Sequence, residues 1–358
     1  MSNLLRTIFI IGILIFVFLL FVWQMSSLLQ IRLLDLENYL LASRMLLHQQ
    51  NPYGSVEFFA PPWFALFLLP LVNLPLEFSA SIWLLLNLAC IVIVVILSLN
   101  WLGRKSSSEK IFFTTIIPIL MPGALISYIT GQVTPVVAAA ILFIAWGITT
   151  SHIRAWLIFI CLLLATLKPH IVVLPGLICL LELIRKKQWR VILMIAIGII
   201  IIVGLLSIWI PDWLPSIIES WIGGDYKGGR PGLISAGYVG LRELGIPVWI
   251  FLPVLLYTLW RWRMDGLSPY VFSLALCVNL LIVPYSRVYD FVVLIFPLLS
   301  LTELRQKQDY FIMLLSMISI FVLSFTILSL LIPVLFMLAL LFKHALNSQI
   351  ARPVFGRR

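Results

Sequence analysis

Apolar runs recur along almost the whole chain, from residue 7 to residue 342. A helix needs about 20 apolar residues to cross the hydrocarbon layer of a bilayer, and several runs reach or approach that length. Hydrophobic residues make up 62% of the chain and charged residues 11%, whereas charged residues are about a quarter of an average soluble domain. These features exclude a soluble enzyme. They predict a single all-α integral membrane domain, a polytopic transmembrane helical bundle of about 10 to 13 spans, several of them short or broken.

Apolar and polar segments alternate and divide the predicted domain, residues 1–358, into six parts. These are a first span at 7–29, an outer loop at 30–61, core spans at 62–210, a second outer loop at 211–245, C-terminal spans at 246–342 and a basic cytoplasmic tail at 343–358. As one helix, the run from 310 to 342 would be about 50 Å long, too long for one ordinary span. We therefore expect a tight hairpin broken near Pro333.

Basic residues predict the orientation of the chain. The segment 185–190 is strongly basic and lies between two apolar runs, and short basic loops remain in the cytoplasm. Arg261, Arg263 and the tail at 343–358 fall on the same side if each run between them crosses once. The loop at 102–110 is ambiguous, because its basic residues favour the inside while a count of spans puts it outside.

The formal net charge of +10 is explained by these loops, so we expect no nucleic-acid partner. Glu182 lies beside the basic segment 185–190, and we expect it to be solvated or to lie at the lipid interface. The four cysteines, all inside apolar runs without metal-ligand spacing, are expected to be packing residues.

Asp35 and Glu37 follow the first span closely. The residues after them, up to Leu47, have helical periodicity with one apolar face, which predicts an amphipathic helix lying at the outer membrane surface. Asp35 would lie at the N-terminal end of this helix, where a carboxylate can simply cap it. A functional carboxylate at the boundary between water and membrane is the other interpretation, and both remain open.

Polar side chains also interrupt the apolar core. Gln132 lies within one apolar region, and Lys168 and His170 separate two runs, 156–167 and 171–184, that are too short to cross the membrane. Broken helices at membrane depth are tolerated only where they line a cavity or a site. Ionisable residues there are functional by default, although His170 can also be a packing residue.

Arg287 lies between two predicted spans, flanked by tyrosines that include Tyr285 and followed by Asp290. An ion pair between Arg287 and Asp290 at a helix start is one interpretation. A phosphate clamp is the other, because a guanidinium group offers paired donors to phosphate oxygens.

Several of these motifs form an ordered series. It comprises Asp35 with Tyr39, the Asn51-Pro52-Tyr53 turn, the Pro61-Pro62 helix start followed by Leu74-Pro75, Gly131-Gln132, Lys168-Pro169 before the basic loop, and the segment from Ser286 to Asp290. Over about residues 5 to 300 the series resembles glycosyltransferase family 87, the DUF2029 group of mannosyltransferase-like proteins. That family lies within the C-type superfamily of polytopic glycosyltransferases that use polyprenyl-phosphate sugars. Ala60, Thr134 and His170 depart from the family pattern, which usually has an aromatic residue, Asn and Gln there.

The resemblance implies a membrane hexosyltransferase. It would move a hexose, expected to be mannose, from a polyprenyl-phosphate sugar to a lipid or glycan acceptor at the extracytoplasmic face of the cell membrane, with inversion. The expected catalytic residues are Asp35, as general base, and Glu37. The expected substrate-binding residues are Tyr39, Tyr53, Gln132, Lys168, His170, Arg242, Tyr285, Arg287 and Asp290.

We expect no cofactor. Asp35 and Glu37 offer oxygen ligands to a divalent metal, but two carboxylates are too few for a full site. A secondary transporter or flippase for a lipid-linked or anionic small substrate is the alternative function, because transporters also use broken helices and buried cations. A non-catalytic assembly or lipid-handling role is a further one. The two matching halves typical of many transporters are not evident in the sequence.

Overall fold

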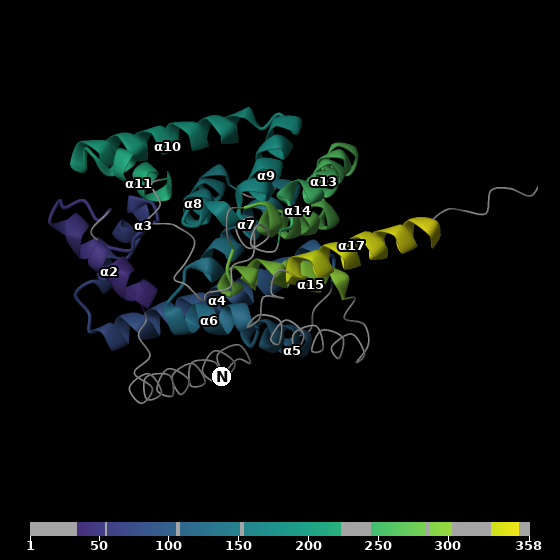
Figure 1. The fold of residues 1–358 in the computed structure, drawn as a ribbon, viewed down its shortest axis with the longest axis horizontal. Coiled ribbons are helices and arrows are strands. Elements are labelled where there is room, and N and C mark those ends of the chain that lie inside the picture. Colours follow the sequence, from purple (N-terminus) through teal and green to yellow (C-terminus); the bar gives the residue numbers. More distant parts are fainter. Residues whose placement is uncertain are drawn as a thin grey trace, which may run out of the picture.

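A computed structural model gives the fold of the chain. It describes residues 34–53, 56–104, 108–150, 154–222, 245–283, 286–302 and 331–350. Every regular element within these ranges is helical (Figure 1), which confirms the predicted all-α class. The predicted first span at 7–29 and much of the second outer loop, including Arg242, lie outside the described residues, as does Tyr285.

The helices follow one another along the chain as short and long segments. They are α2 (Leu34–Leu47), α3 (Pro62–Phe67), η1 (Leu69–Leu71), α4 (Leu76–Trp101), α5 (Ser108–Ile119), α6 (Pro122–Thr130), α7 (Thr134–Thr150), α8 (Ala155–Ala165), η2 (Pro169–Ile171), α9 (Val173–Arg185), α10 (Trp189–Trp209), α11 (Trp213–Ile222), η3 (Val248–Phe251), α13 (Leu252–Asp265), α14 (Pro269–Ile282), η4 (Val288–Leu294), α15 (Ile295–Leu301) and α17 (Leu331–Ile350).

Proline begins several of these helices. Pro62 starts α3, as expected from the Pro pair, and Pro122 and Pro269 start α6 and α14. Proline suits the first turn, because its fixed φ is helical and the N–H that it lacks would have no partner there. The apolar runs are therefore cut into short helices at defined positions.

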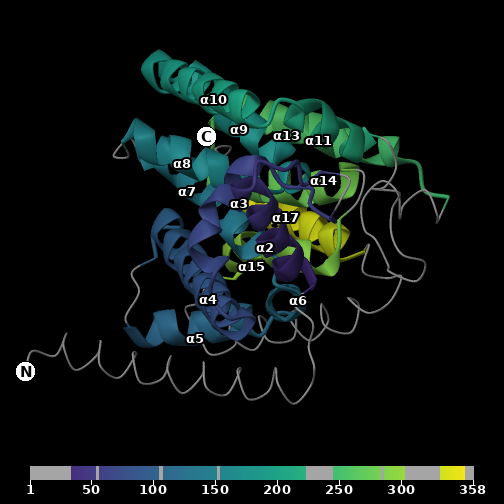
Figure 2. The ribbon, with the colours of Figure 1, turned by 90° about the vertical axis from the view of Figure 1, so that its left-hand side faces the viewer.

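Two described helices, α4 and α10, are long and apolar enough to cross a membrane. In α4, 56% of the most apolar window is buried inside the protein, and the helix packs against α7. In α10 only 6% of that window is buried, and Ile208 is 81% exposed. An apolar helix so open to its surroundings is stable in lipid and unfavourable in water, which fits a lipid-facing position at the edge of the bundle (Figure 2).

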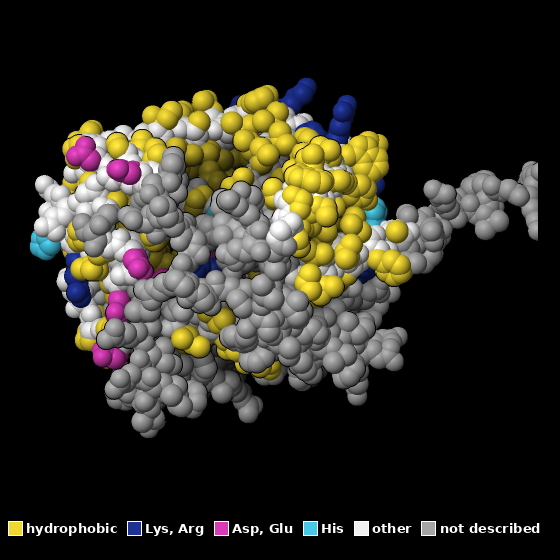
Figure 3. Space-filling view, viewed as in Figure 1, with side chains coloured by type: hydrophobic (Ala, Val, Ile, Leu, Met, Phe, Trp, Pro, Cys, Tyr) yellow, Lys and Arg dark blue, Asp and Glu magenta, His cyan; other side chains and the backbone are white. Residues whose placement is uncertain are grey.

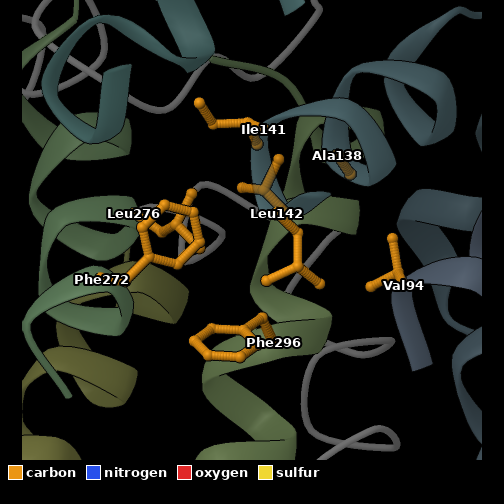
Figure 4. A pocket seen from close by; sticks show the side chains of 8 residues that line it. Val94, Ala138, Ile141, Leu142, Phe272, Leu276 and Phe296 are labelled. Carbon is orange, nitrogen blue, oxygen red and sulfur yellow. The ribbon is translucent and has the colours of Figure 1, made fainter. Parts of the chain in front are cut away.

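The core lies where α4, α7, α14 and α15 meet. The rings of Trp101, Phe272 and Phe296 pack against one another there, with centroids 5.1 to 5.5 Å apart. A small pocket beside them is lined only by apolar side chains, including Leu142 and Leu276 (Figure 4). It is a gap in hydrophobic packing without a polar group to bind a substrate.

One end of the bundle holds the described parts of both predicted outer loops. The amide of Asn51 donates a hydrogen bond to the hydroxyl of Ser216 in α11 (2.9 Å), and the rings of Trp63 and Trp213 meet edge to face. The helix α2 also lies at this end (Figure 1). It is more deeply packed than a surface helix would be, since residues such as Leu36 are fully buried.

The opposite end holds basic side chains. Arg104 donates to the carbonyl of Leu299 (2.7 Å), and Lys343 donates to the carbonyls of Ser300 and Leu301 (3.0 Å each), so both side chains cap α15. The ambiguous loop at 102–110 therefore begins at the same end as the C-terminal basic segment. This agrees with its basic residues and not with the count of spans.

The sequence prediction for Glu182, at this end, is wrong. Glu182 is 1% exposed and is not solvated: it accepts hydrogen bonds from Arg185 (2.7 and 2.9 Å), from the indole of Trp262 (3.2 Å) and from the backbone of Leu267 (3.3 Å). It thus ties α9 to α13 and to the turn between α13 and α14. The last described helix, α17, spans Leu331–Ile350, includes Pro333 and extends beyond the predicted tail boundary at 342. The predicted hairpin near Pro333 stays a prediction, because residues 310–330 lie outside the described part.

Figure 3 shows the same polarity on the surface. Most of the acidic side chains in view gather on the left, over α2 and α11, where some basic atoms also lie, and other basic side chains project at the upper right, where α9 and α13 end. The helix α7 connects the two ends, from Thr134 to Ile148, whose carbonyl accepts a hydrogen bond from Lys186. This stretch is about 21 Å long at 1.5 Å per residue.

Candidate functional site

A carboxylate and an amide meet at the outer-loop end. Asp35, in the first turn of α2, accepts a hydrogen bond from the side-chain amide of Gln132 (2.6 Å). Gly131 makes this approach possible, because it ends α6 in the left-handed conformation (φ +75°) and a Cβ there would lie 2.7 Å from the Cβ of Leu36. Only glycine adopts that conformation freely and leaves that space. The carbonyl of Gly131 also accepts a hydrogen bond from the indole of Trp83 (2.8 Å), which fixes the turn.

The environment of Asp35 shifts the pKa of its carboxyl group. Burial raises the pKa of the carboxyl group above its ordinary value, and the neighbouring Glu57 acts in the same direction. The positive charge of Lys168, the hydrogen bond from Gln132 and the charge of Arg287 oppose the shift. A raised pKa makes the ionised carboxylate a stronger base.

Lys168 lies almost fully buried at the break between α8 and α9, 9% exposed. Its ammonium group donates to the hydroxyl of Thr134 and to a carboxylate oxygen of Asp290, both at 2.9 Å. It also lies 4.0 Å from the centre of the Tyr289 ring, a cation–π distance. The expected break with a cation inside it is therefore present, and its charge is paired.

Asp290, fully buried in the first turn of η4, completes this cluster. Its second oxygen accepts from the backbone N–H of Arg287 (2.9 Å) and lies 3.8 Å from Nε2 of His170. Of the two interpretations of the Arg287 segment, the ion pair within it is therefore wrong, because Asp290 pairs with Lys168. No acidic side chain in the described ranges lies within ion-pair distance of the guanidinium of Arg287.

Asn279, which the sequence interpretation missed, holds the break from the other side. Its side chain accepts from the backbone of Leu174 (2.9 Å) and donates to the carbonyl of His170 (2.9 Å), and it is fully buried in α14. An amide inside the apolar run 269–282 was the signal that could have identified it. Asn279 and Asp290 together fasten the break around η2 to the segments on either side of Ser286.

The other expected site residues have different surroundings. Tyr39 is buried and packs edge to face on Phe64, 4.9 Å between ring centres. Tyr53 is also buried, and its hydroxyl donates to the carbonyl of Ala60 (2.8 Å). Glu37 is partly exposed two residues after Asp35, a rotation of about 200° along a helix that turns it away from Gln132.

The described residues contain no group of three or more His, Cys, Asp or Glu side chains that could hold a metal ion. The chemistry that the site offers is that of a half-buried carboxylate beside an amide, a paired ammonium and a guanidinium that no described carboxylate neutralises. Such a set can take a proton from a hydroxyl group and bind an anion nearby.

A comparison with protein families gives one match. The model of glycosyltransferase family 87 matches residues 58–286, which include Gln132, Lys168 and Asn279 and end just before Arg287. No match was found among curated proteins or among solved structures. Because the family model covers more than half of the chain, the protein belongs to glycosyltransferase family 87 and is a membrane glycosyltransferase.

Proposed function

We propose that the protein transfers a hexose, expected to be mannose, from a polyprenyl-phosphate sugar to a hydroxyl group of a lipid or glycan acceptor. The transfer takes place at the extracytoplasmic face of the membrane and inverts the anomeric carbon. The observation that carries the proposal is the contact between Asp35 and Gln132, within electrostatic range of Lys168 and Arg287.

Asp35 acts as the general base in this reaction. The acceptor oxygen forms a bond to the anomeric carbon, and its proton passes to the carboxylate of Asp35. The bond between the anomeric carbon and the phosphate oxygen breaks, and its electron pair leaves with the lipid phosphate. A single displacement of this kind inverts the anomeric centre.

Arg287 is the residue best suited to hold the leaving phosphate. Its guanidinium has no ion-pair partner among the described side chains, and it lies close enough to Asp35 to lower that residue's pKa. Arginine presents paired donors that match phosphate oxygens. Lys168 adds positive charge to the site, while its ion pair with Asp290 holds the α8–α9 break in place.

The placement of the site supports the extracytoplasmic face. Asp35 and Gln132 lie at the Thr134 end of α7, and Lys186 lies against the Ile148 end. Basic loops favour the cytoplasm, so the site belongs on the opposite side. A donor linked to a membrane lipid is accessible there, whereas a cytoplasmic nucleotide sugar is not.

Reconstituted protein tests the proposal. Proteoliposomes containing membrane lipid extract as the acceptor pool are supplied with radiolabelled polyprenyl-phosphate mannose or glucose, and release of lipid phosphate and labelling of the lipid pool are measured. We expect transfer from the mannose donor by the wild type and by Glu37→Gln, and at least about a hundredfold less by Asp35→Asn. Transfer from a nucleotide sugar in the absence of any lipid-linked donor would contradict the proposal.

A further inference from the structure

Gln132 has one polar atom that the described part of the protein leaves without a partner. The side chain is 4% exposed. Its amide nitrogen donates to Asp35, but its carbonyl oxygen, Oε1, is buried and accepts no hydrogen bond from any described residue. Buried polar atoms are nearly always paired, and an exception calls for an explanation such as a missing ligand.

The hydrogen bond to Asp35 fixes the direction of this amide. An ionised carboxylate only accepts hydrogen bonds, so in the state in which Asp35 acts as a base the NH₂ group of Gln132 must face it. Turning the amide over would place Oε1 against a carboxylate oxygen and remove the contact. Oε1 therefore lies next to the general base, because it belongs to the same planar amide group as the NH₂ that contacts Asp35.

The partner of Oε1 must be a hydrogen-bond donor. A carbonyl oxygen has no proton to give, so an ionised phosphate oxygen cannot bind it, and the donor phosphate belongs with Arg287. A hydroxyl group satisfies the requirement. Under the function proposed above, the attacking hydroxyl of the acceptor contacts Asp35, which would place the acceptor next to Oε1.

We propose that Gln132 determines acceptor specificity by binding two neighbouring hydroxyl groups together with Asp35. The first hydroxyl gives its proton to Asp35 and attacks the sugar donor. The hydroxyl on the adjacent carbon of the same acceptor donates a hydrogen bond to Oε1 of Gln132. The acceptor is accordingly a compound with vicinal hydroxyl groups, as in a sugar ring, rather than a lipid with one isolated alcohol. This inference rests on the proposed function, since it takes Asp35 to be the base.

The test combines a protein variant with acceptor analogues. Wild type and Gln132→Met, with Gln188→Met at the exposed opposite end as the matched control, are reconstituted with radiolabelled polyprenyl-phosphate mannose. The acceptors are octyl mannoside, its set of single-deoxy analogues and dodecanol, and kcat/KM is measured for each. Thermal stability of each variant shows whether it is folded.

We expect the wild type and the control to use octyl mannoside and to lose about 10- to 100-fold in kcat/KM when the hydroxyl next to the attacked one is removed. In Gln132→Met the same removal should change kcat/KM less than about threefold, because the partner atom is already gone. The intact acceptor should also react more slowly in this variant, since Asp35 loses its hydrogen bond.

Other results overturn the inference. An equal loss in wild type and Gln132→Met would mean that another group binds the second hydroxyl or that Oε1 binds only water. Dodecanol used as well as octyl mannoside would exclude a requirement for a vicinal diol. With a 2-deoxy donor sugar, a fall in kcat/KM that is seen in the wild type and not in Gln132→Met would instead assign Oε1 to the donor sugar. Full activity of Asp35→Asn would instead contradict the proposed function itself, so the two failures are distinguishable.

Discussion

The buried ion pair between Lys168 and Asp290 should stabilise the protein measurably. The two charges are 2.9 Å apart, and the side chains are almost fully buried. At an effective dielectric constant of about 20 their attraction is about 6 kcal/mol, most of which offsets the loss of hydration. Removing one partner leaves the other charge buried alone, so we expect Lys168→Met and Asp290→Asn each to lower the free energy of unfolding by about 3 to 5 kcal/mol.

The double variant separates the pair from other effects. Lys168→Met together with Asp290→Asn leaves neither charge buried, so its loss should be about 1 to 3 kcal/mol smaller than the sum of the two single losses. Arg287→Gln is the matched control, and we expect a change within about 0.5 kcal/mol, because the guanidinium has no described acidic partner. Its KM for the lipid-linked donor should rise about 10- to 100-fold instead, through loss of a charge-assisted hydrogen bond to phosphate.

Denaturant unfolding of the purified protein in detergent, followed by tryptophan fluorescence, measures these differences. The reasoning would be refuted if the two single losses were additive in the double variant. It would also be refuted if Arg287→Gln destabilised the protein as much as Lys168→Met does, since Arg287 would then hold the structural ion pair. An unchanged donor KM in Arg287→Gln would remove that residue from the phosphate site.

Three further predictions concern the base, the turn beside it and the orientation of the chain. Transfer by the wild type should fall with acidification below a pKa that lies above the ordinary value of an aspartate, because protonation of Asp35 removes the base; a pH profile flat through that range would contradict this role. Gly131→Ala should destabilise the protein by about 2 to 4 kcal/mol in denaturant unfolding, because Gly131 has a positive φ and lies against α2. Gly204 has open space around it, so the control variant Gly204→Ala should be neutral within about 1 kcal/mol or slightly stabilising. In a cysteine-free background, a cysteine at Glu219 should react with an impermeant thiol reagent in intact cells and one at Gln188 should not; the reverse result would put the site in the cytoplasm.

Periodicity and composition were enough to predict the helical class and the short helices around Lys168. In a membrane, interrupted apolar runs of this kind must pair their backbone N–H and C=O groups internally, and short helices are the main way to do so. Resemblance brought Asp35 and Gln132 into one proposed site although they are 97 positions apart in the chain. No local pattern predicts their hydrogen bond, since it depends on how closely the turn at Gly131 approaches α2.

Charge pairing was the least predictable feature. Proximity in sequence left Arg287 open as a partner of Asp290. The first turn of η4 instead directs one carboxylate oxygen to the backbone N–H of Arg287 and leaves the other for Lys168, 122 positions away. Glu182 likewise has the sequence context of an exposed loop residue and is buried by contacts with Trp262 and Leu267. In both cases long-range contacts determine the partner of the carboxylate, and the neighbouring residues in the sequence do not predict these contacts.

The distance in sequence between Lys168 and Asp290 also matters for how the protein is made. Synthesis proceeds from the N-terminus, so Lys168 enters the membrane while its partner is still untranslated. An unpaired cation on a membrane helix costs about 2.5 to 3.5 kcal/mol even by insertion scales. The helices α8 and α9 are short and flank the lysine closely. Until η4 has been synthesised and inserted, we expect the hairpin that they form to keep its charge near the water. Completion of the ion pair is thus a late event in biogenesis, one that makes the final position of this hairpin depend on the last third of the chain.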